Sequence, residues 1–315
     1  MTTKNPALPS TSTDRPYLGI LLMLCFCVMV PVSDAGVKFL GASVPVLQLM
    51  LARFVLQWLA LLPMMFIGQR TLFMSSRLLW LTLIRTLLHM VGIGAMVISL
   101  QYLPLADTIA IAFVMPLLLL LLGHFVLGEH VGRKRLVACV IGFAGTLMVV
   151  QPSFAQVGAP ALLPLLVAVS FAGFMLVTRP IARRIDPISL QIISGVMGSV
   201  LMVGAYLAGS FTDWPMFTTT LPNQSDAILL LLICLLGTAA HLVMAWALRL
   251  APSTTLAPIQ YVEIPVATLV GWLIFRDIPN GLAAIGIMIT MVVGVYVVLN
   301  ERTNARAVPA SEAQN

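Results

Sequence analysis

Apolar residues run along this chain in ten long stretches that short polar connections separate. The stretches lie at residues 17–39, 45–67, 78–101, 105–127, 136–150, 160–178, 188–209, 227–247, 255–275 and 282–299. A helix needs about 20 mostly apolar residues to cross a bilayer. The pattern therefore predicts an all-α membrane protein with ten transmembrane helices, and the short connections leave no room for a separate soluble domain.

The composition agrees with this pattern. Hydrophobic residues make up 60% of the chain and charged residues only 9%, whereas a soluble domain has about 25% charged residues. The first apolar stretch is longer than the core of a signal peptide and ends without a cleavage motif, so we expect it to remain as a helix. The polar ends, residues 1–16 and 300–315, cannot bury a core and are predicted to be disordered tails.

Basic residues are distributed unequally between the two sides that ten helices would define. With the N-terminus inside, the outer side holds only Lys38 and Arg276. The inner side holds thirteen basic residues: Lys4, Arg15, Arg70, Arg77, Arg133, Lys134, Arg135, Arg179, Arg183, Arg184, Arg249, Arg302 and Arg306. Cytoplasmic loops are rich in Lys and Arg. We therefore predict that both termini are cytoplasmic, and we attribute the net charge of +6 to topology rather than to nucleic-acid binding.

Motifs for other classes of protein are missing from the sequence. It has no G-x-S-x-G, no H-E-x-x-H and no P-loop, so a membrane enzyme or an ATP-driven pump is disfavoured. All four cysteines fall within apolar stretches and are expected to act as small hydrophobic residues. We predict no metal and no cofactor. A receptor is a further alternative, but the connections are too short to bind much outside the membrane.

Two parts of the chain correspond at an offset of 148 residues. Residues 105–135 match 253–283, which places Gly123 on Gly271 and Glu129 on Asp277. The corresponding segments suggest two five-helix repeats, at residues 17–150 and 160–299. Because each repeat has an odd number of helices, the second would enter the membrane inverted. Inverted repeats are typical of secondary transporters, whose substrate site lies between the repeats near the middle of the membrane.

These segments also carry a family resemblance. ADTIAIAFVMPLLLLLLGHFVLGEHVG in the first half and STTLAPIQYVEIPVATLVGWLIFRDIPNG in the second resemble the fourth helices of the EamA branch of the drug/metabolite transporter superfamily. The resemblance implies ten helices, a central cavity and alternating access. The second copy departs from the family pattern, because Arg276-Asp277 replaces Gly-Glu. The segment APIQYVEIP resembles members assigned to riboflavin uptake and, less closely, members assigned to S-adenosylmethionine uptake.

Glu263 is the main candidate for a functional side chain. It lies eight residues into the ninth stretch, at a depth where a carboxylate must be paired, protonated or in contact with water. Pro258 and Pro265 flank it, and each removes a backbone donor from the helix. Together with Pro116 in the fourth stretch, they are candidate helix breaks. Glu263 could carry transport, or it could be a structural carboxylate that bridges two helices.

Three further ionisable residues lie within the stretches. Arg53 could pair with Glu263, or hold an anionic group of a substrate, since a buried guanidinium needs a partner. His89 could relay protons, because histidine changes charge near physiological pH, or it could be a neutral residue that hydrogen-bonds a neighbouring helix. We expect Arg85, near the inner face, to extend back to the lipid headgroups.

Flat polar side chains near Glu263 are candidates for the wall of a substrate site, since aromatic rings stack on flat ligands. They are Gln260, Tyr261 and Trp246, whereas Trp272 and Tyr102 suit the interfacial aromatic belts. Other polar residues are predicted to have plainer roles. His124 and His241 should be structural and Asp34 should face water. Glu129 should belong to the fold, and Arg133 is within reach of it for a salt bridge.

These observations predict a secondary transporter in a bacterial inner membrane, acting as a monomer or a homodimer on a small-molecule substrate. Riboflavin or a similar aromatic vitamin, moving inward, is the favoured substrate. S-adenosylmethionine uptake and the export of amino acids or related metabolites are the alternatives. The direction of transport and the coupling ion do not follow from the sequence.

Overall fold

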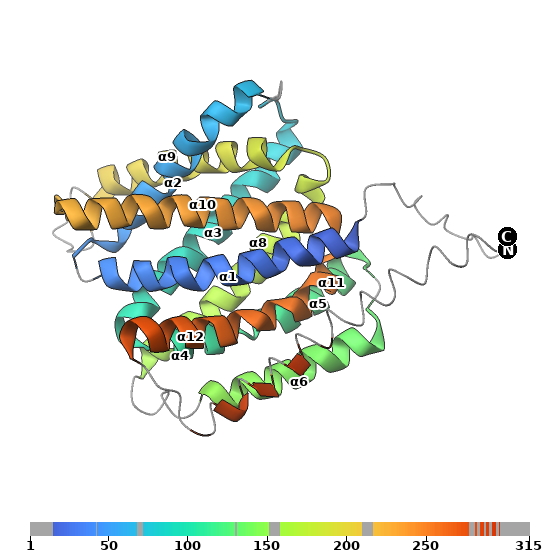
Figure 1. Cartoon of the computed structure of the whole chain (residues 1–315). Helices are drawn as coiled ribbons and strands as arrows, with labels where there is room; N and C mark the ends of the chain where they lie inside the picture. The colour runs from blue at the N-terminus through green and yellow to red at the C-terminus, as the bar shows by residue number, and fades with distance from the viewer. Residues whose placement is uncertain are drawn as a thin grey trace, which may run out of the picture.

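Every element in the described part of the chain is a helix (Figure 1). The computed structural model describes residues 15–296, except 42, 68–71, 130, 151–157, 210–216, 277–280, 282–283, 287, 290–291 and 294–295. The elements are α1 (Pro16–Leu40), α2 (Val46–Ile67), α3 (Ser76–Tyr102), α4 (Leu105–Ala112), α5 (Met115–Leu127), α6 (Arg133–Val150), η1 (Ala159–Leu162), α8 (Leu163–Ala182), α9 (Pro187–Gly209), α10 (Gln224–Leu250), α11 (Ser253–Leu256), η3 (Ala257–Val262) and α12 (Glu263–Phe275).

Seven helical segments among the described residues are long and apolar enough to cross a membrane. They are α1, α2, α3, α8, α9, α10 and the segment from Ser253 to Phe275, which comprises α11, η3 and α12. Helix α5 is apolar but shorter. The chain is thus an all-helical, multi-pass membrane protein. Most of the tenth predicted stretch, residues 1–14 and 300–315 of the predicted tails, and Asp277 lie outside the described residues, so the count of ten helices stays a prediction.

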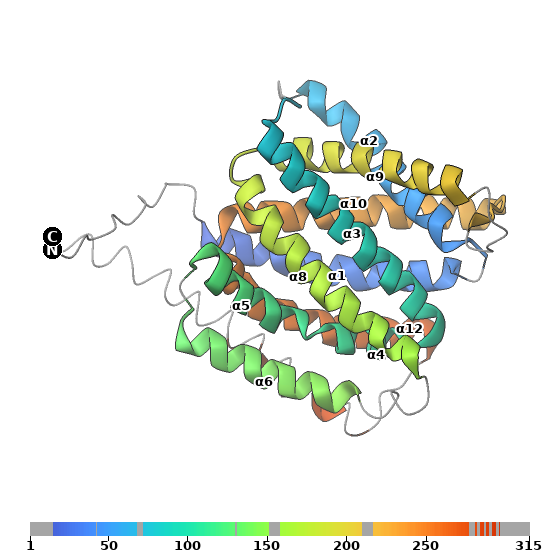
Figure 2. The ribbon, with the colours of Figure 1, turned by 180° about the vertical axis from the view of Figure 1, so that it is seen from behind.

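The helices form a bundle in which neighbours come from distant parts of the sequence. Figures 1 and 2 show α1 beside α10 and α3 beside α8, and α2 packs against α9. Glycines allow this close approach, as small residues do in membrane helix pairs. A Cβ atom on Gly36 of α1 would lie 2.3 Å from the Ile233 side chain of α10. One on Gly198 of α9 would lie 2.4 Å from the Phe54 ring of α2.

The fourth and ninth predicted stretches are not continuous α-helices. The fourth is divided into α4 and α5 by a turn at residues 113–114, and Pro116 is the second residue of α5. In the ninth, the 3₁₀ segment η3 contains Pro258, and Pro265 lies in the first turn of α12. A non-helical backbone at membrane depth is tolerated where protein surrounds it. Residues 256–261 satisfy this condition, because all of them are buried.

The contact between α6 and η3 provides a test of this packing. The ring of Tyr261 lies against Gly142, and a Cβ atom there would stand 2.7 Å from two ring carbons. Gly142→Ala should lower the melting temperature of the detergent-solubilised protein, because overpacking costs about 1–3 kcal/mol. Gly204→Ala in α9 is the matched control, since nothing lies within 4 Å of its Cβ position. An unchanged melting temperature for Gly142→Ala would contradict this packing.

Candidate functional site

A small cavity of about 60 Å³ lies in the middle of the bundle. Four of its lining residues are charged or titratable, and each comes from a different helix: Asp34 of α1, Arg53 of α2, His241 of α10 and Glu263 of α12. The rest of the lining is apolar, with three phenylalanines and three methionines: Phe26, Phe113, Phe171, Met96, Met115 and Met175. This volume holds only water molecules, so the helices must separate before an organic solute can enter.

Glu263 is held in this cavity by the break in the ninth stretch. It is the first residue of α12, directly after the 3₁₀ segment, and its side chain is only 6% exposed. Asp34 is an acidic group that acts electrostatically on it. The lining thus brings two carboxyl groups and one guanidinium to a single space. Ionisable groups at this depth usually mark a substrate or ion pathway.

Asp34 was expected to face water, and this expectation is wrong. It is buried, lines the cavity and interacts electrostatically with Arg53. The reason is the position of α1, which packs against both α10 and α12. A sequence signal did exist, because Phe26, Val30 and Asp34 are spaced four residues apart and so share one face of a helix.

Arg53 lies in the cavity as a candidate partner for an anionic group. Asp34 is the carboxyl group that interacts electrostatically with Arg53, whereas the sequence had offered Glu263 as one possible partner. The guanidinium rests on the backbone of α10 at Gly237, where a Cβ atom would lie 2.8 Å from a guanidinium nitrogen. Only glycine at position 237 leaves room for Arg53 in this orientation.

Arg85 does not extend to the headgroups, so that prediction is wrong. Its side chain is fully buried and donates hydrogen bonds to Thr178 Oγ1 (2.8 Å), Ser194 Oγ (2.7 Å) and Gln191 Oε1 (2.9 Å). The guanidinium also lies 4.4 Å from the centre of the Phe174 ring. Three neutral oxygen acceptors and an aromatic face from α8 and α9 stabilise the charge better than a long path back to the interface.

His89 and His241 meet at the centre of the bundle. Their Nε2 atoms are 3.2 Å apart, and the His89 ring stacks on Phe174 at a centroid distance of 4.5 Å. His89 was a candidate from the sequence, whereas His241 was expected to be structural. The structure places His241 in the cavity lining beside Glu263 and Arg53.

The three candidates for a substrate wall lie outside the lining of this cavity. Tyr261 points toward α6, where its hydroxyl donates to the Cys139 carbonyl oxygen at 3.0 Å. Gln260 is buried, and its amide nitrogen lies 3.4 Å from Met175 Sδ. Trp246 packs with Leu61 and Ile192 in a separate apolar cluster. Each side chain follows the local helix face, which the sequence could not orient.

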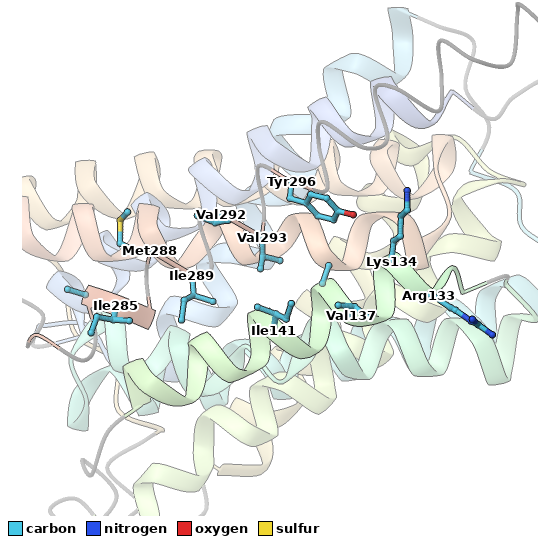
Figure 3. A pocket seen from close by; sticks show the side chains of 12 residues that line it. Arg133, Lys134, Val137, Ile141, Ile285, Met288, Ile289, Val292, Val293 and Tyr296 are labelled. Carbon is cyan, nitrogen blue, oxygen red and sulfur yellow. The ribbon is translucent and has the colours of Figure 1, made fainter.

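A second, larger pocket of about 900 Å³ lies between α6 and the described residues of the tenth stretch (Figure 3). Its lining is aliphatic apart from Arg133, Lys134 and Tyr296. Figure 3 shows Lys134 and Tyr296 at one end of the pocket and Arg133 directed outward. None of the described residues in the middle of this pocket would orient a polar solute, so the central cavity is the better candidate site.

A polar cluster around Glu129 closes one end of the bundle. Glu129 accepts hydrogen bonds from Ser253 Oγ at 2.7 Å and from the Thr254 backbone N–H at 3.0 Å, and so caps the start of α11. Arg179 Nε lies 2.5 Å from the Glu129 carboxylate, and its Nη1 donates to the carbonyl oxygens of Leu248 and Ala251. Glu129 therefore pairs with Arg179 of α8, and not with the expected Arg133.

Comparison with known proteins identifies the family. The model of the EamA-like transporter family matches residues 17–151 and again residues 159–300. The chain belongs to the EamA-like transporter family. This confirms the family that the repeated fourth-helix segments predicted.

Several named relatives resemble this EamA-like protein over most of its length. A riboflavin transporter of Rhizobium johnstonii is 27% identical over 72% of this chain and 72% of its own length. An S-adenosylmethionine uptake transporter of Rickettsia bellii is 25% identical over 90% of this chain and 94% of its own length. A riboflavin transporter of Vibrio cholerae is 25% identical over 93% and 96%.

A solved crystal structure shares the fold of this EamA-like protein. It superposes with a TM-score of 0.68 and covers 91% of this chain and 99% of its own chain. The two sequences are 17% identical, so the similarity supports the arrangement of helices alone.

The Glu129 cluster leads to a prediction on stability. Glu129→Gln should lower the free energy of unfolding by about 3–5 kcal/mol, because it removes the charged partner that Arg179 has in this buried ion pair. Denaturant titration in detergent micelles would measure the loss. Asp226→Asn is the control, since Asp226 is a half-buried acid in the first turn of α10 whose carboxylate accepts a hydrogen bond from the Asn223 side chain. Equal, small losses for both variants would show that the Glu129 pair does not stabilise the bundle.

Proposed function

We propose that this EamA-like protein is a secondary transporter that takes up a small aromatic metabolite across a bacterial inner membrane by alternating access, with riboflavin as the first candidate. The observation that carries the proposal is the central cavity, where Asp34, Arg53, His241 and Glu263 face one another among aromatic and methionine side chains. Polar groups that converge inside an apolar membrane bundle are typical of a solute pathway.

The arrangement of helices supports the proposal of two inverted repeats. If α1, α2 and α3 correspond in order to α8, α9 and α10, exchanging the halves converts the α1–α10 pair into the α8–α3 pair. These are the two most extensive helix pairs in the described part of the chain, and α2–α9 is converted into itself. The interrupted segments α4–α5 and α11–η3–α12 would also correspond to each other. The cavity then lies at the interface of the repeats, where transporters bind substrate.

The aromatic lining favours a flat ring as the substrate. Phe26, Phe113 and Phe171 come from three different parts of the chain and face the same space. Such rings can stack on the isoalloxazine ring of riboflavin. The charged groups of the cavity can then hydrogen-bond the polar side chain of the same molecule. Relatives named riboflavin transporters agree with this choice.

S-adenosylmethionine is the second candidate, and the charges of the cavity favour it. This solute carries an amino-acid group with a carboxylate and an ammonium. Arg53 would bind the carboxylate, and Asp34 and Glu263 would bind the positive centres, because charge-assisted hydrogen bonds are stronger than neutral ones. Relatives named S-adenosylmethionine uptake transporters match the chain over 90% or more of its length.

Counterflow into proteoliposomes tests the proposal and separates the two substrates. Arg53→Gln should raise the KM for S-adenosylmethionine more than about tenfold, because a charge-assisted hydrogen bond contributes about 1.5–3 kcal/mol. Phe171→Ala should weaken riboflavin counterflow more than Arg53→Gln does. Arg77→Gln, an exposed arginine outside the cavity, is the charge-matched control. Counterflow of amino acids alone would favour the exporter, and no counterflow of any of these solutes would overturn the proposal.

We also propose that both termini are cytoplasmic. The basis is the distribution of basic residues, which puts the loop before α10 outside. Leu221 in that loop is fully exposed. In a chain without native cysteines, Leu221→Cys should react with an impermeant maleimide added to intact cells. Single cysteines at positions 5 and 310 should react only after the cells are lysed, and reaction of either one in intact cells would reverse or refute this topology.

A further inference from the structure

The contact between His89 and His241 joins the two halves of the bundle. His89 belongs to α3 and His241 to α10, and their Nε2 atoms are 3.2 Å apart. At this distance one imidazole must donate its Nε2–H and the other must accept with a bare Nε2. The closed contact therefore holds one hydrogen between the two nitrogens. It is stable only while at least one ring keeps a free lone pair there.

Aromatic rings enclose the pair and keep other hydrogen-bond partners away. Phe54 and Phe174 contact His89, and Phe26 and Phe171 contact His241. The Nδ1 atom of His241 is buried and has no hydrogen-bond partner in the part of the chain that the structure describes. His241 also lines the cavity, so its ring is the first of the two to meet water when the cavity opens.

The charged groups around the pair come from four helices. Arg53 of α2 and Arg85 of α3 act electrostatically on both rings. Asp34 of α1 and Glu263 of α12 share the cavity with His241. Like charges repel in a low-dielectric interior, so the closed pair is neutral while both arginines lie beside it. The two carboxyl groups can balance an added positive charge once the rings separate.

We propose that His89 and His241 form the proton-binding site that couples transport to the proton gradient. The inference rests on the proposed function and adds the coupling ion to it. When α3 and α10 separate and water enters, the freed Nε2 lone pair takes one proton from the water on that side, and a neutral imidazole becomes an imidazolium. The rings meet again after that proton leaves to the water on the other side. Closing earlier would place an imidazolium beside Arg53 and Arg85.

Accumulation and exchange in proteoliposomes separate coupling from substrate binding. His241→Asn and His89→Asn keep a hydrogen-bonding side chain but cannot take up a proton. Both should lose more than about tenfold of the accumulation driven by a pH gradient, since an imidazole takes up a proton near physiological pH and an amide does not. His89→Asn should also retain counterflow within about threefold of the native protein, because His89 lies outside the cavity lining. His124→Asn, an exposed histidine on α5, is the control and should accumulate normally. Native accumulation in both pair variants would overturn the proposal.

A second measurement needs no substrate, so failure of the proposed function remains distinguishable. Ala112 lines the cavity, and Ala112→Cys in a chain without native cysteines reports on its opening through a water-soluble maleimide. At each pH, the labelling rate of the chain with both histidines is divided by the rate of the His89→Asn/His241→Asn double variant. This ratio should rise at least about threefold from pH 7.5 to pH 5.5, the range in which imidazole gains its proton. If labelling depends on pH in the same way with and without the two histidines, the proposed proton-binding site is refuted. If the native protein shows no counterflow but the pH dependence of labelling requires the two histidines, the proposed substrates are wrong and the proton-binding site is retained.

Discussion

A bilayer offers no water to a charge or a broken backbone, so this fold depends on the protein to supply every partner from within. The Glu129 carboxylate receives the hydroxyl of Ser253, a backbone N–H of α11 and the guanidinium of Arg179. Arg179 in turn donates to carbonyl oxygens at the end of α10. One ion pair thus satisfies the termini of two helices and joins them to α5 and α8. The same rule explains why Arg85 gathers three neutral acceptors from helices far away in the sequence.

Close helix packing makes these polar contacts geometrically possible. Gly123 of α5 shows the relation directly, because a Cβ atom there would lie 2.8 Å from Ser253 Oγ and 3.2 Å from Glu129 Oε2. Gly237 does the same for Arg53 in the cavity. In both cases a missing side chain on one helix makes room for a charged group from another. The glycines of this bundle therefore serve electrostatics as well as close packing.

The cavity combines features that suit transport more than tight static binding. It is small in this arrangement, and its four titratable or charged groups come from four helices. Separating those helices changes which of these groups face each other and which face water. A site of this kind can change its affinity for a solute with the conformation of the bundle, as alternating access requires. Relatives that share about a quarter of the sequence carry the names of different substrates, so the shared fold alone does not fix the solute.

The sequence by itself determined the all-helical membrane character and the family, and it singled out Glu263 as a candidate. Hydropathy, proline positions and the repeated fourth-helix segments are local properties, and they can be read without knowing which helices touch. The partners of the charged side chains depended on tertiary structure. Asp34 and His241 looked peripheral, and Arg85 had an apparent route to the headgroups, until the packing of α1, α8 and α10 placed all three inside. Tyr261 lay close to Glu263 in sequence, yet the 3₁₀ segment between α11 and α12 turned it toward α6. In an almost uniformly apolar helix the sequence does not mark which face points to lipid and which to protein, so only the contacts between helices decide the position of each polar group.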